Sequence, residues 1–112
     1  MYVSITRLKL KSIWLLPKFA KQSGRVAKQA QDSPGYIKVK LSNRWFRYFY
    51  TLTLWRSRAD MQQFVIHGDH KVAMQEWSKF ATEVKALGYE TEAAPKWKEV
   101  RKRIATEGKT TR

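Results

Sequence analysis

The chain contains only two histidines, and both lie in one short segment, His67-Gly-Asp-His70. An imidazole titrates near neutral pH, so it can act as a general base or a proton shuttle. His70 falls on one helical stripe with Met74 and Trp77, and a stripe of this kind faces the interior. We therefore predict that His70 is the catalytic residue; the alternative is a packing or capping histidine that bonds a backbone carbonyl. His67 is predicted to lie at a helix end.

Aromatic side chains precede this segment in the run Phe49-Tyr-Thr-Leu-Thr-Leu-Trp55. A strand that ends in aromatic residues beside an imidazole would line a cavity for a flat or polyene molecule. Ordinary packing, in the core or at a subunit interface, is the alternative for each of these residues. The predicted substrate-binding residues are Trp55, Phe49, Met74 and Trp77, and Tyr50 and Trp45 complete the aromatic set.

The residue types of the chain exclude several kinds of chemistry. It has no cysteine, which excludes disulfides, thiolate ligands and a cysteine nucleophile. Two histidines and scattered acids show no spacing typical of zinc ligands, so no metal site is predicted. There is no glycine-rich phosphate loop and no dinucleotide fingerprint. The cofactor stays open between none and heme, for which His70 would be the axial ligand, and oxygen chemistry would use either the substrate's own electrons or a heme.

Hydrophobic periodicity predicts the elements that position these side chains. We expect strands over residues 2–10, 36–42, 47–55 and 89–93, and helices over 17–31, 57–67 and 69–88. This order predicts an α+β ferredoxin-like sandwich with an antiparallel sheet. Residues 1–97 are expected to form a single domain. Residues 98–112 are expected to form a basic tail that starts with a short helix and is disordered from 107 onward.

The predicted strand over residues 47–55 is apolar or aromatic on both faces. Such a strand lies centrally in a sheet that is covered on both sides. Helices cover only one face in the predicted sandwich. A second copy of the chain would therefore cover the other face, as a two-fold homodimer.

Positive charge is concentrated in the first half of the chain. Residues 1–50 carry eleven Lys and Arg against one acid, Asp32, and the net charge of the whole chain is +14. Such a field attracts anionic lipid headgroups or nucleic acid. A basic stripe follows the first helix, and a second cluster surrounds Trp97: Lys11, Lys18, Lys21, Arg25 and Lys28, and Lys96, Lys98, Arg101, Lys102 and Arg103. A solvated face is the alternative for both.

The longest apolar run, Ile13 to Leu16, is too short to span a bilayer or to form a signal-peptide core. We therefore expect a soluble cytoplasmic protein, with peripheral contact to the anionic inner face of the membrane through its basic side chains. Nucleic acid is a less favoured partner, because no recognised binding motif is present.

Four segments of the chain carry a recognisable pattern: Leu16-Pro-Lys-Phe19, Gln31-Asp-Ser-Pro-Gly35, Phe49 to Ser57, and Phe64-Val-Ile-His-Gly-Asp-His70-Lys-Val-Ala-Met74. With these segments the chain resembles the dimeric α/β-barrel monooxygenases, a group that includes the antibiotic-biosynthesis monooxygenases and, more closely, the spheroidene-monooxygenase-like proteins. They occur in the expected order, and the resemblance covers roughly residues 2–97.

The resemblance implies a homodimer in which two sandwiches form an α/β barrel. It also implies an oxygenase-type enzyme, a monooxygenase, that acts on a hydrophobic aromatic or polyene molecule in a pocket between the helices and the sheet. The same superfamily contains heme-binding proteins, heme-degrading enzymes and proteins with no demonstrated chemistry. The alternative function is therefore a non-catalytic binding module, either a nucleic-acid binder or a carrier of a ligand or heme.

Overall fold

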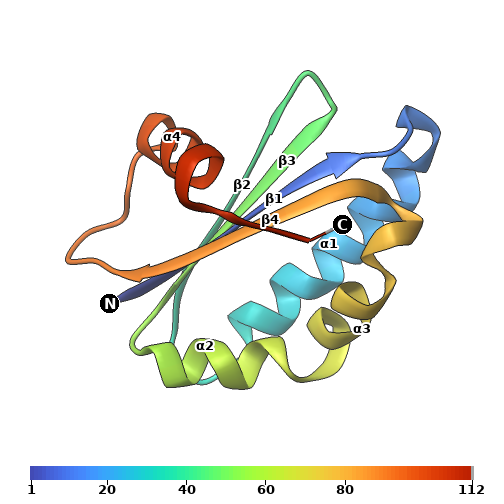
Figure 1. Cartoon of the computed structure of the whole chain (residues 1–112). Helices are drawn as coiled ribbons and strands as arrows, with labels where there is room; N and C mark the ends of the chain where they lie inside the picture. Colours follow the sequence, from blue (N-terminus) through green and yellow to red (C-terminus); the bar gives the residue numbers. More distant parts are fainter. Residues whose placement is uncertain (112) are drawn as a thin grey trace.

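The computed structural model describes residues 1–111, which form four α-helices and one five-stranded antiparallel sheet (Figure 1). The strands are β1 (Tyr2–Leu10), β2 (Tyr36–Arg44), β3 (Tyr48–Trp55), β4 (Ala81–Glu90) and β5 (Lys109–Thr111). The α-helices are α1 (Leu16–Gln31), α2 (Arg58–Val65), α3 (Gly68–Glu76) and α4 (Trp97–Glu107), and the short 3-10 helices are η1 (Ile13–Leu15) and η2 (Trp77–Lys79).

The strand β1 lies at the centre of the sheet, whose order is β2-β3-β1-β4-β5. Ile5 of β1 lies opposite Leu52 of β3 on one side and Leu87 of β4 on the other, and all of the pairings are antiparallel. Side chains alternate between the two faces along each strand. This arrangement confirms the predicted α+β ferredoxin-like fold.

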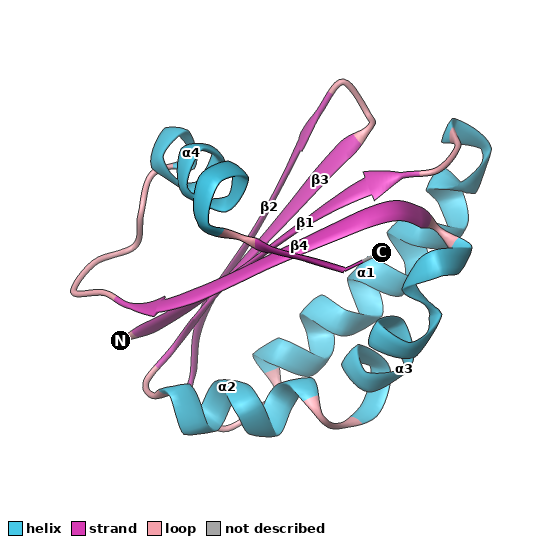
Figure 2. Cartoon of the chain, in the orientation of Figure 1, coloured by secondary structure: helices cyan, strands magenta, loops and turns pink. Residues whose placement is uncertain are grey.

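The first face of the sheet is covered by α1, α2 and α3, as Figure 2 shows. Ser57 begins α2 as predicted, because its side chain accepts a hydrogen bond from the backbone N–H of Asp60 at 3.2 Å. Beneath these helices, Trp55 and Phe64 pack in a buried cluster with Tyr2 and Ala30. No helix within residues 1–111 has the length and apolar character needed to cross a membrane.

The second face of the sheet is covered by α4, which differs from the expected basic tail over residues 98–112. Val100 and Ile104 are fully buried and join a cluster that includes Ile5, Tyr50 and Leu52, which we call the α4 cluster. The two residues lie four apart, which places them on one side of the helix. Residues 98–107 therefore belong to the packed structure, and α4 covers the apolar face that we had assigned to a partner subunit.

The segment after α3 also differs from the prediction of a helix to residue 88 and a strand over 89–93. The helix α3 ends at Glu76, and Ala81–Glu90 is the strand β4. Ala81 and Val84 have helical spacing, but Val84 lies opposite Leu8 of β1 in the sheet. Pairing with the central strand thus overrides the local pattern. Only two residues of the predicted strand, Tyr89 and Glu90, belong to β4.

The last described residues form β5, which pairs with β4 from Ala86 to Val84. This differs from the disorder that was expected over residues 107–112. Arg112 lies outside the described residues.

Truncation of Ile104 tests the role of α4. We expect Ile104→Ala to lower the free energy of unfolding by about 2–5 kcal/mol, because it removes a buried side chain between the helix and the sheet. The matched control is Lys102→Ala, an exposed residue of the same helix, which should change stability by less than about 0.5 kcal/mol. Urea unfolding measures both, and equal midpoints for the two variants would contradict the packing of α4.

Candidate functional site

A cavity of about 120 Å³ lies between the first face of the sheet and the helical layer. Its walls come from β1, β2, β3 and β4 on one side and from α1, α2, α3 and η2 on the other. We call it the inner cavity. It is the space in which the sequence predicted a binding pocket, and His70 is one of its lining residues.

The side chain of His70 is held in one orientation by its neighbours. Its ring nitrogen Nδ1 lies 3.2 Å from the backbone carbonyl oxygen of Val65, and the ring of Phe64 meets it edge-on at 4.7 Å between centroids. A carbonyl oxygen only accepts, so Nδ1 carries the hydrogen in this bond. In the neutral ring, Nε2 is then the nitrogen that can accept a proton.

Burial lowers the pKa of His70 below its ordinary value of 6.5, and the hydrogen bond to the Val65 carbonyl opposes this effect. The ring is therefore neutral at neutral pH. A neutral imidazole with a free Nε2 has the protonation state that a general base needs.

A glutamine of α1 fixes the position of His70 through the backbone. The side-chain amide of Gln29 donates to the carbonyl oxygens of Phe64 and His67, at 3.2 and 2.8 Å. Its oxygen accepts from the backbone N–H of His70 at 2.8 Å. We call these three bonds the Gln29 bridge. It joins α1 to the turn between α2 and α3, and our sequence analysis did not identify it, because no local pattern relates residue 29 to residues 64–70.

Gly68 allows the close approach that the Gln29 bridge requires. Its φ of +55° is left-handed, a conformation that glycine adopts readily and that is common just past a helix end. A Cβ atom at this position would lie 3.2 Å from Cδ of Gln29. Both the backbone conformation and the available space therefore favour glycine.

Four hydroxyl side chains lie on the sheet side of the inner cavity, which our sequence analysis also did not identify. Ser4 and Thr6 of β1 lie opposite Thr53 and Thr51 of β3 in the sheet. The two pairs form a polar square on the floor, whose other sheet residues, Leu8, Val39, Phe49 and Val84, are apolar. Hydroxyls both donate and accept, so the square can bind a polar substituent of a flat apolar ligand.

Of the predicted substrate-binding residues, Phe49, Met74 and Trp77 line the inner cavity together with His70. Met74 lies at the rim, with 58% of its surface exposed. Trp77 belongs to η2, because α3 ends one residue earlier.

The structure places Trp55 outside the inner cavity, which corrects its predicted role in binding. It is fully buried, with its ring 4.9 Å from Phe64 and 6.3 Å from Tyr36. Trp55 therefore supports Phe64, which in turn contacts His70. The rest of the predicted aromatic set also lies elsewhere: Tyr50 is buried in the α4 cluster, and Trp45 lies at the tip of the β2–β3 hairpin.

A second cavity, of about 300 Å³, lies between α1 and the strands β2 and β3. We call it the outer cavity. The two cavities share four wall residues, among them Phe19 and Phe49, whose rings meet edge-on at 5.0 Å. This aromatic pair thus belongs to the boundary between the two cavities.

The inner cavity does not fit a heme. Its volume is below the range of about 300–1,000 Å³ that is typical of pockets for drug-sized ligands. Its lining contains no Lys or Arg that could pair with the carboxylates of a porphyrin. His70 could supply an axial nitrogen, but the space around it does not accommodate the macrocycle.

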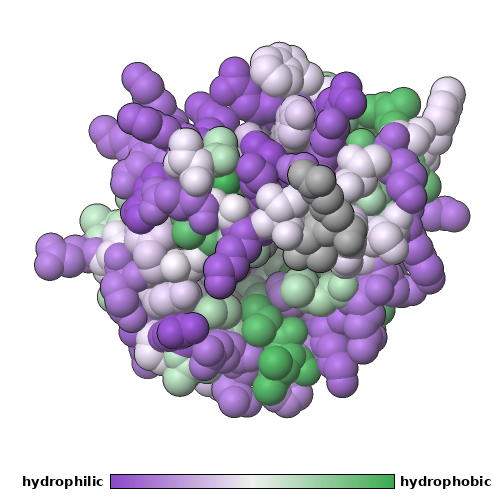
Figure 3. All heavy atoms as spheres, in the orientation of Figure 1, coloured by the Kyte–Doolittle hydropathy of each residue, from purple (hydrophilic) through white to green (hydrophobic). Residues whose placement is uncertain are grey.

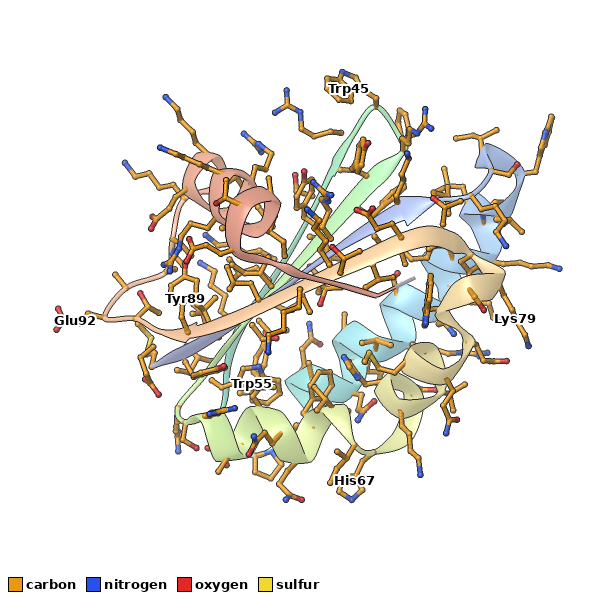
Figure 4. All side chains as sticks on the ribbon, viewed as in Figure 1. Trp45, Trp55, His67, Lys79, Tyr89 and Glu92 are labelled. Atoms are coloured by element: carbon orange, nitrogen blue, oxygen red, sulfur yellow. The ribbon has the colours of Figure 1, made fainter. Side chains whose placement is uncertain are left out.

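His67 lies away from the inner cavity, at the far end of the molecule from the hairpin tip (Figure 4). Its exposed ring has Nδ1 at 2.6 Å from the carbonyl oxygen of Gln63. This agrees with the predicted helix-end residue. Within residues 1–111, no group of three or more His, Asp or Glu side chains is placed to hold a metal ion.

Comparisons with solved structures find this fold in oxygenase-like proteins. SnoaB, a cofactor-independent oxygenase from Streptomyces nogalater, is 9% identical with a TM-score of 0.71, over 83% of this chain and 94% of that protein. A candidate antibiotic biosynthesis monooxygenase from Nitrosomonas europaea is 17% identical with a TM-score of 0.72, over 83% and 100%. Another from Deinococcus radiodurans is 16% identical with a TM-score of 0.74, over 86% and 97%.

These neighbours confirm the predicted resemblance to the antibiotic-biosynthesis monooxygenases at the level of the fold. No family model matches the sequence, and no curated protein matches it. A shared fold at this level of identity does not determine a reaction, which depends on the residues that line the cavity.

The lowered pKa of His70 predicts a specific pH dependence of stability. Below pH 6.5 the unfolded chain takes up a proton that the partly buried ring resists, so the free energy of unfolding falls as the pH drops from 6.5 to the folded pKa. Above pH 6.5 the ring is neutral in both states, and the free energy of unfolding does not change with pH on its account. We expect His70→Asn to remove this part of the loss, measured by urea unfolding at about pH 7.5 and about pH 5. If the free energy of unfolding falls by the same amount in the variant and the wild type, the His70 ring does not resist protonation in the folded protein.

Gln29→Ala tests the Gln29 bridge. We expect it to lower the free energy of unfolding by about 1–3 kcal/mol and to speed hydrogen exchange at the His70 amide, since three backbone groups lose their partner. Gln31→Ala is the matched control, because Gln31 is an exposed glutamine of the same helix. If both variants exchange the His70 amide at the wild-type rate, the bridge does not hold the turn.

Proposed function

We propose that the protein is an oxygenase that oxidises a small hydroxylated aromatic molecule in the inner cavity, with His70 as the general base. One observation carries the proposal: the His70 ring is held through Nδ1 on the wall of a cavity whose floor bears four hydroxyls. A base and a polar anchor thus line the same apolar space. The fold shared with oxygenase-like proteins agrees with it.

The size and polarity of the inner cavity support the aromatic part of the sequence prediction rather than the polyene part. A volume of about 120 Å³ suits one or two fused rings better than an extended chain. Phe49 and Trp77 provide aromatic walls for a flat ring. The hydroxyls of Thr51 and Thr53 would bind an oxygen substituent of that ring.

The reaction would begin when Nε2 of His70 takes the proton of a substrate hydroxyl. The resulting phenolate gives up electrons more readily than the phenol, so it can reduce O₂ directly. One oxygen atom replaces a ring hydrogen and forms a new C–O bond, and the other leaves as water. In the simplest case, phenol and O₂ give benzoquinone and one water. The substrate supplies all four electrons that reduce the two oxygen atoms of O₂, so neither an external reductant nor a heme is required.

Oxygen uptake with a panel of simple phenols and naphthols tests the proposal. We expect His70→Asn to lower the rate by roughly 10²–10⁴-fold, as for loss of a general base. We expect the double variant Thr51→Val, Thr53→Val to raise KM more than it lowers kcat, because it removes a binding contact. With labelled O₂, one labelled atom should appear in the product and one in water.

His67→Asn is the matched control, since it removes the other imidazole from an exposed position outside the cavity. It should retain the wild-type rate. Equal rates of oxygen uptake for His70→Asn and the wild type would refute the role of His70 as a general base. Tight binding of phenols without any oxygen uptake would favour the alternative function, a non-catalytic ligand carrier.

We infer a homodimer from the resemblance alone, because the apolar sheet face is already covered within one chain. Val100 and Ile104 of α4 already cover the apolar sheet face that a second copy was expected to cover. Sedimentation should give about twice the chain mass of 13.2 kDa. A monomer at micromolar concentration would show that α4 has replaced the partner.

A further inference from the structure

The tip of the β2–β3 hairpin exposes two large aromatic side chains. Trp45 is 76% exposed and Phe46 is 59% exposed. Figure 4 shows Trp45 at the end of the hairpin, directed away from the body of the molecule. The inner cavity, the outer cavity and the α4 cluster include neither residue.

The backbone of this tip is in a conformation that these residue types disfavour. Trp45 and Phe46 have φ values of +57° and +52°, and the N–H of Arg47 bonds the carbonyl oxygen of Arg44 at 3.1 Å. This is a turn of the I′ kind, for which Asn-Gly is the preferred pair. Left-handed φ is unfavourable for a residue with a Cβ atom, because the Cβ crowds the backbone. The tip is therefore less stable than it would be with Asn-Gly, and it exposes two aromatic rings.

A second exposed apolar pair lies at the same end of the molecule. Ile13 and Trp14 of η1 are 52% and 88% exposed. They follow β1 directly, and the N–H of Leu10 bonds the carbonyl oxygen of Arg47 beside the hairpin tip at 2.7 Å. Figure 3 shows hydrophobic atoms over the start of α1, at the upper right. We call Ile13, Trp14, Trp45 and Phe46 the aromatic end.

Positive charge surrounds the aromatic end. Four exposed cations lie within five residues of its members in sequence: Lys11, Lys18, Arg44 and Arg47. The guanidinium of Arg44 lies 5.0 Å from the centroid of the Trp45 ring. The nearby acids are already paired, since Glu76 bonds Lys79 and Glu83 bonds Arg7. Within residues 1–111, this end therefore presents positive charge that forms no ion pair, together with exposed apolar groups.

We propose that the aromatic end docks on an anionic lipid bilayer. Tryptophan favours the bilayer interface, and phenylalanine and isoleucine insert among the acyl chains. Each cation near an anionic surface strengthens binding by about five-fold. Nucleic acid fits less well. Proteins that bind single strands stack the bases on aromatic rings along a groove, and an exposed aliphatic residue such as Ile13 would make no such contact.

Docking would bring the outer cavity close to the bilayer. Leu16 and Asn43 line this cavity, and each lies two residues from Trp14 or Trp45 in the sequence. An apolar substrate could then enter from the lipid phase and pass the boundary formed by Phe19 and Phe49. Only this route rests on the proposed function; docking itself does not.

Flotation with phosphatidylcholine vesicles, with and without phosphatidylserine, tests the docking. We expect the wild-type protein to bind the vesicles that contain phosphatidylserine and to be released as salt rises. The decisive variant is the double change Trp45→Asn, Phe46→Gly. It should weaken vesicle binding by at least about ten-fold, since two inserting side chains are lost. Its melting temperature should equal or exceed that of the wild type, because the new pair suits the turn.

Two matched controls distinguish binding through the aromatic end from non-specific hydrophobic adsorption and from the effect of charge elsewhere on the molecule. Ile66→Asn removes an exposed apolar residue beside His67, at the opposite end of the molecule, and should not change binding. Arg44→Gln with Arg47→Gln removes the two charges that flank the hairpin tip and should weaken binding by about 25-fold. Arg56→Gln with Arg58→Gln makes the same change beyond the other end of β3 and should have a much smaller effect.

Three outcomes would overturn the proposal. One is the absence of binding to vesicles that contain phosphatidylserine at low salt. Another is equal binding by the wild type and the Trp45→Asn, Phe46→Gly variant. The third is binding of single-stranded nucleic acid, or self-association, that depends on the tip while vesicles are ignored. None of these results depends on oxygen uptake, so failure of docking and failure of the oxygenase are distinguishable.

Discussion

The double pairing of β1 determines where every other element can lie. Because β1 is bonded to β3 along one side and to β4 along the other, its two faces must each be covered by something else. Val3 and Ile5 on one face are buried under α4. Ser4 and Thr6 on the other face point toward the helical layer, where the inner cavity lies. The α4 cluster and the candidate site thus lie on opposite faces of one strand.

The helical layer is held above that strand by a contact of a different kind. The bond between Val65 and the His70 ring, together with the Gln29 bridge, ties the turn between α2 and α3 to α1. As a result, the orientation of one imidazole depends on three helices. The Trp55 and Phe64 rings fill the space beneath the turn, so that the ring of His70 rests on packed aromatic side chains.

Local patterns in the sequence predicted much of this structure and missed what depends on distant partners. The strands over 2–10 and 47–55 and the start of a helix at residue 57 follow from alternation and from residue type. The stripe through His70 and Met74 also pointed into the cavity. Residues 81–90 were misjudged, because β4 forms only when β1 is beside it. The hydroxyl square and the Gln29 bridge escaped for the same reason, since each joins segments that lie far apart in the chain.

The Gln29 bridge bonds only main-chain atoms at residues 64, 67 and 70. Because these bonds involve no side chain at the three positions, they do not depend on the side chains that stand there. A different side chain at residue 70 would therefore be held in the same place by the same backbone bonds. Constraint falls instead on Gln29 itself and on Gly68, which neither acts on a ligand nor lines the cavity. Related chains that differ in their reaction would then be expected to agree at these two supporting residues.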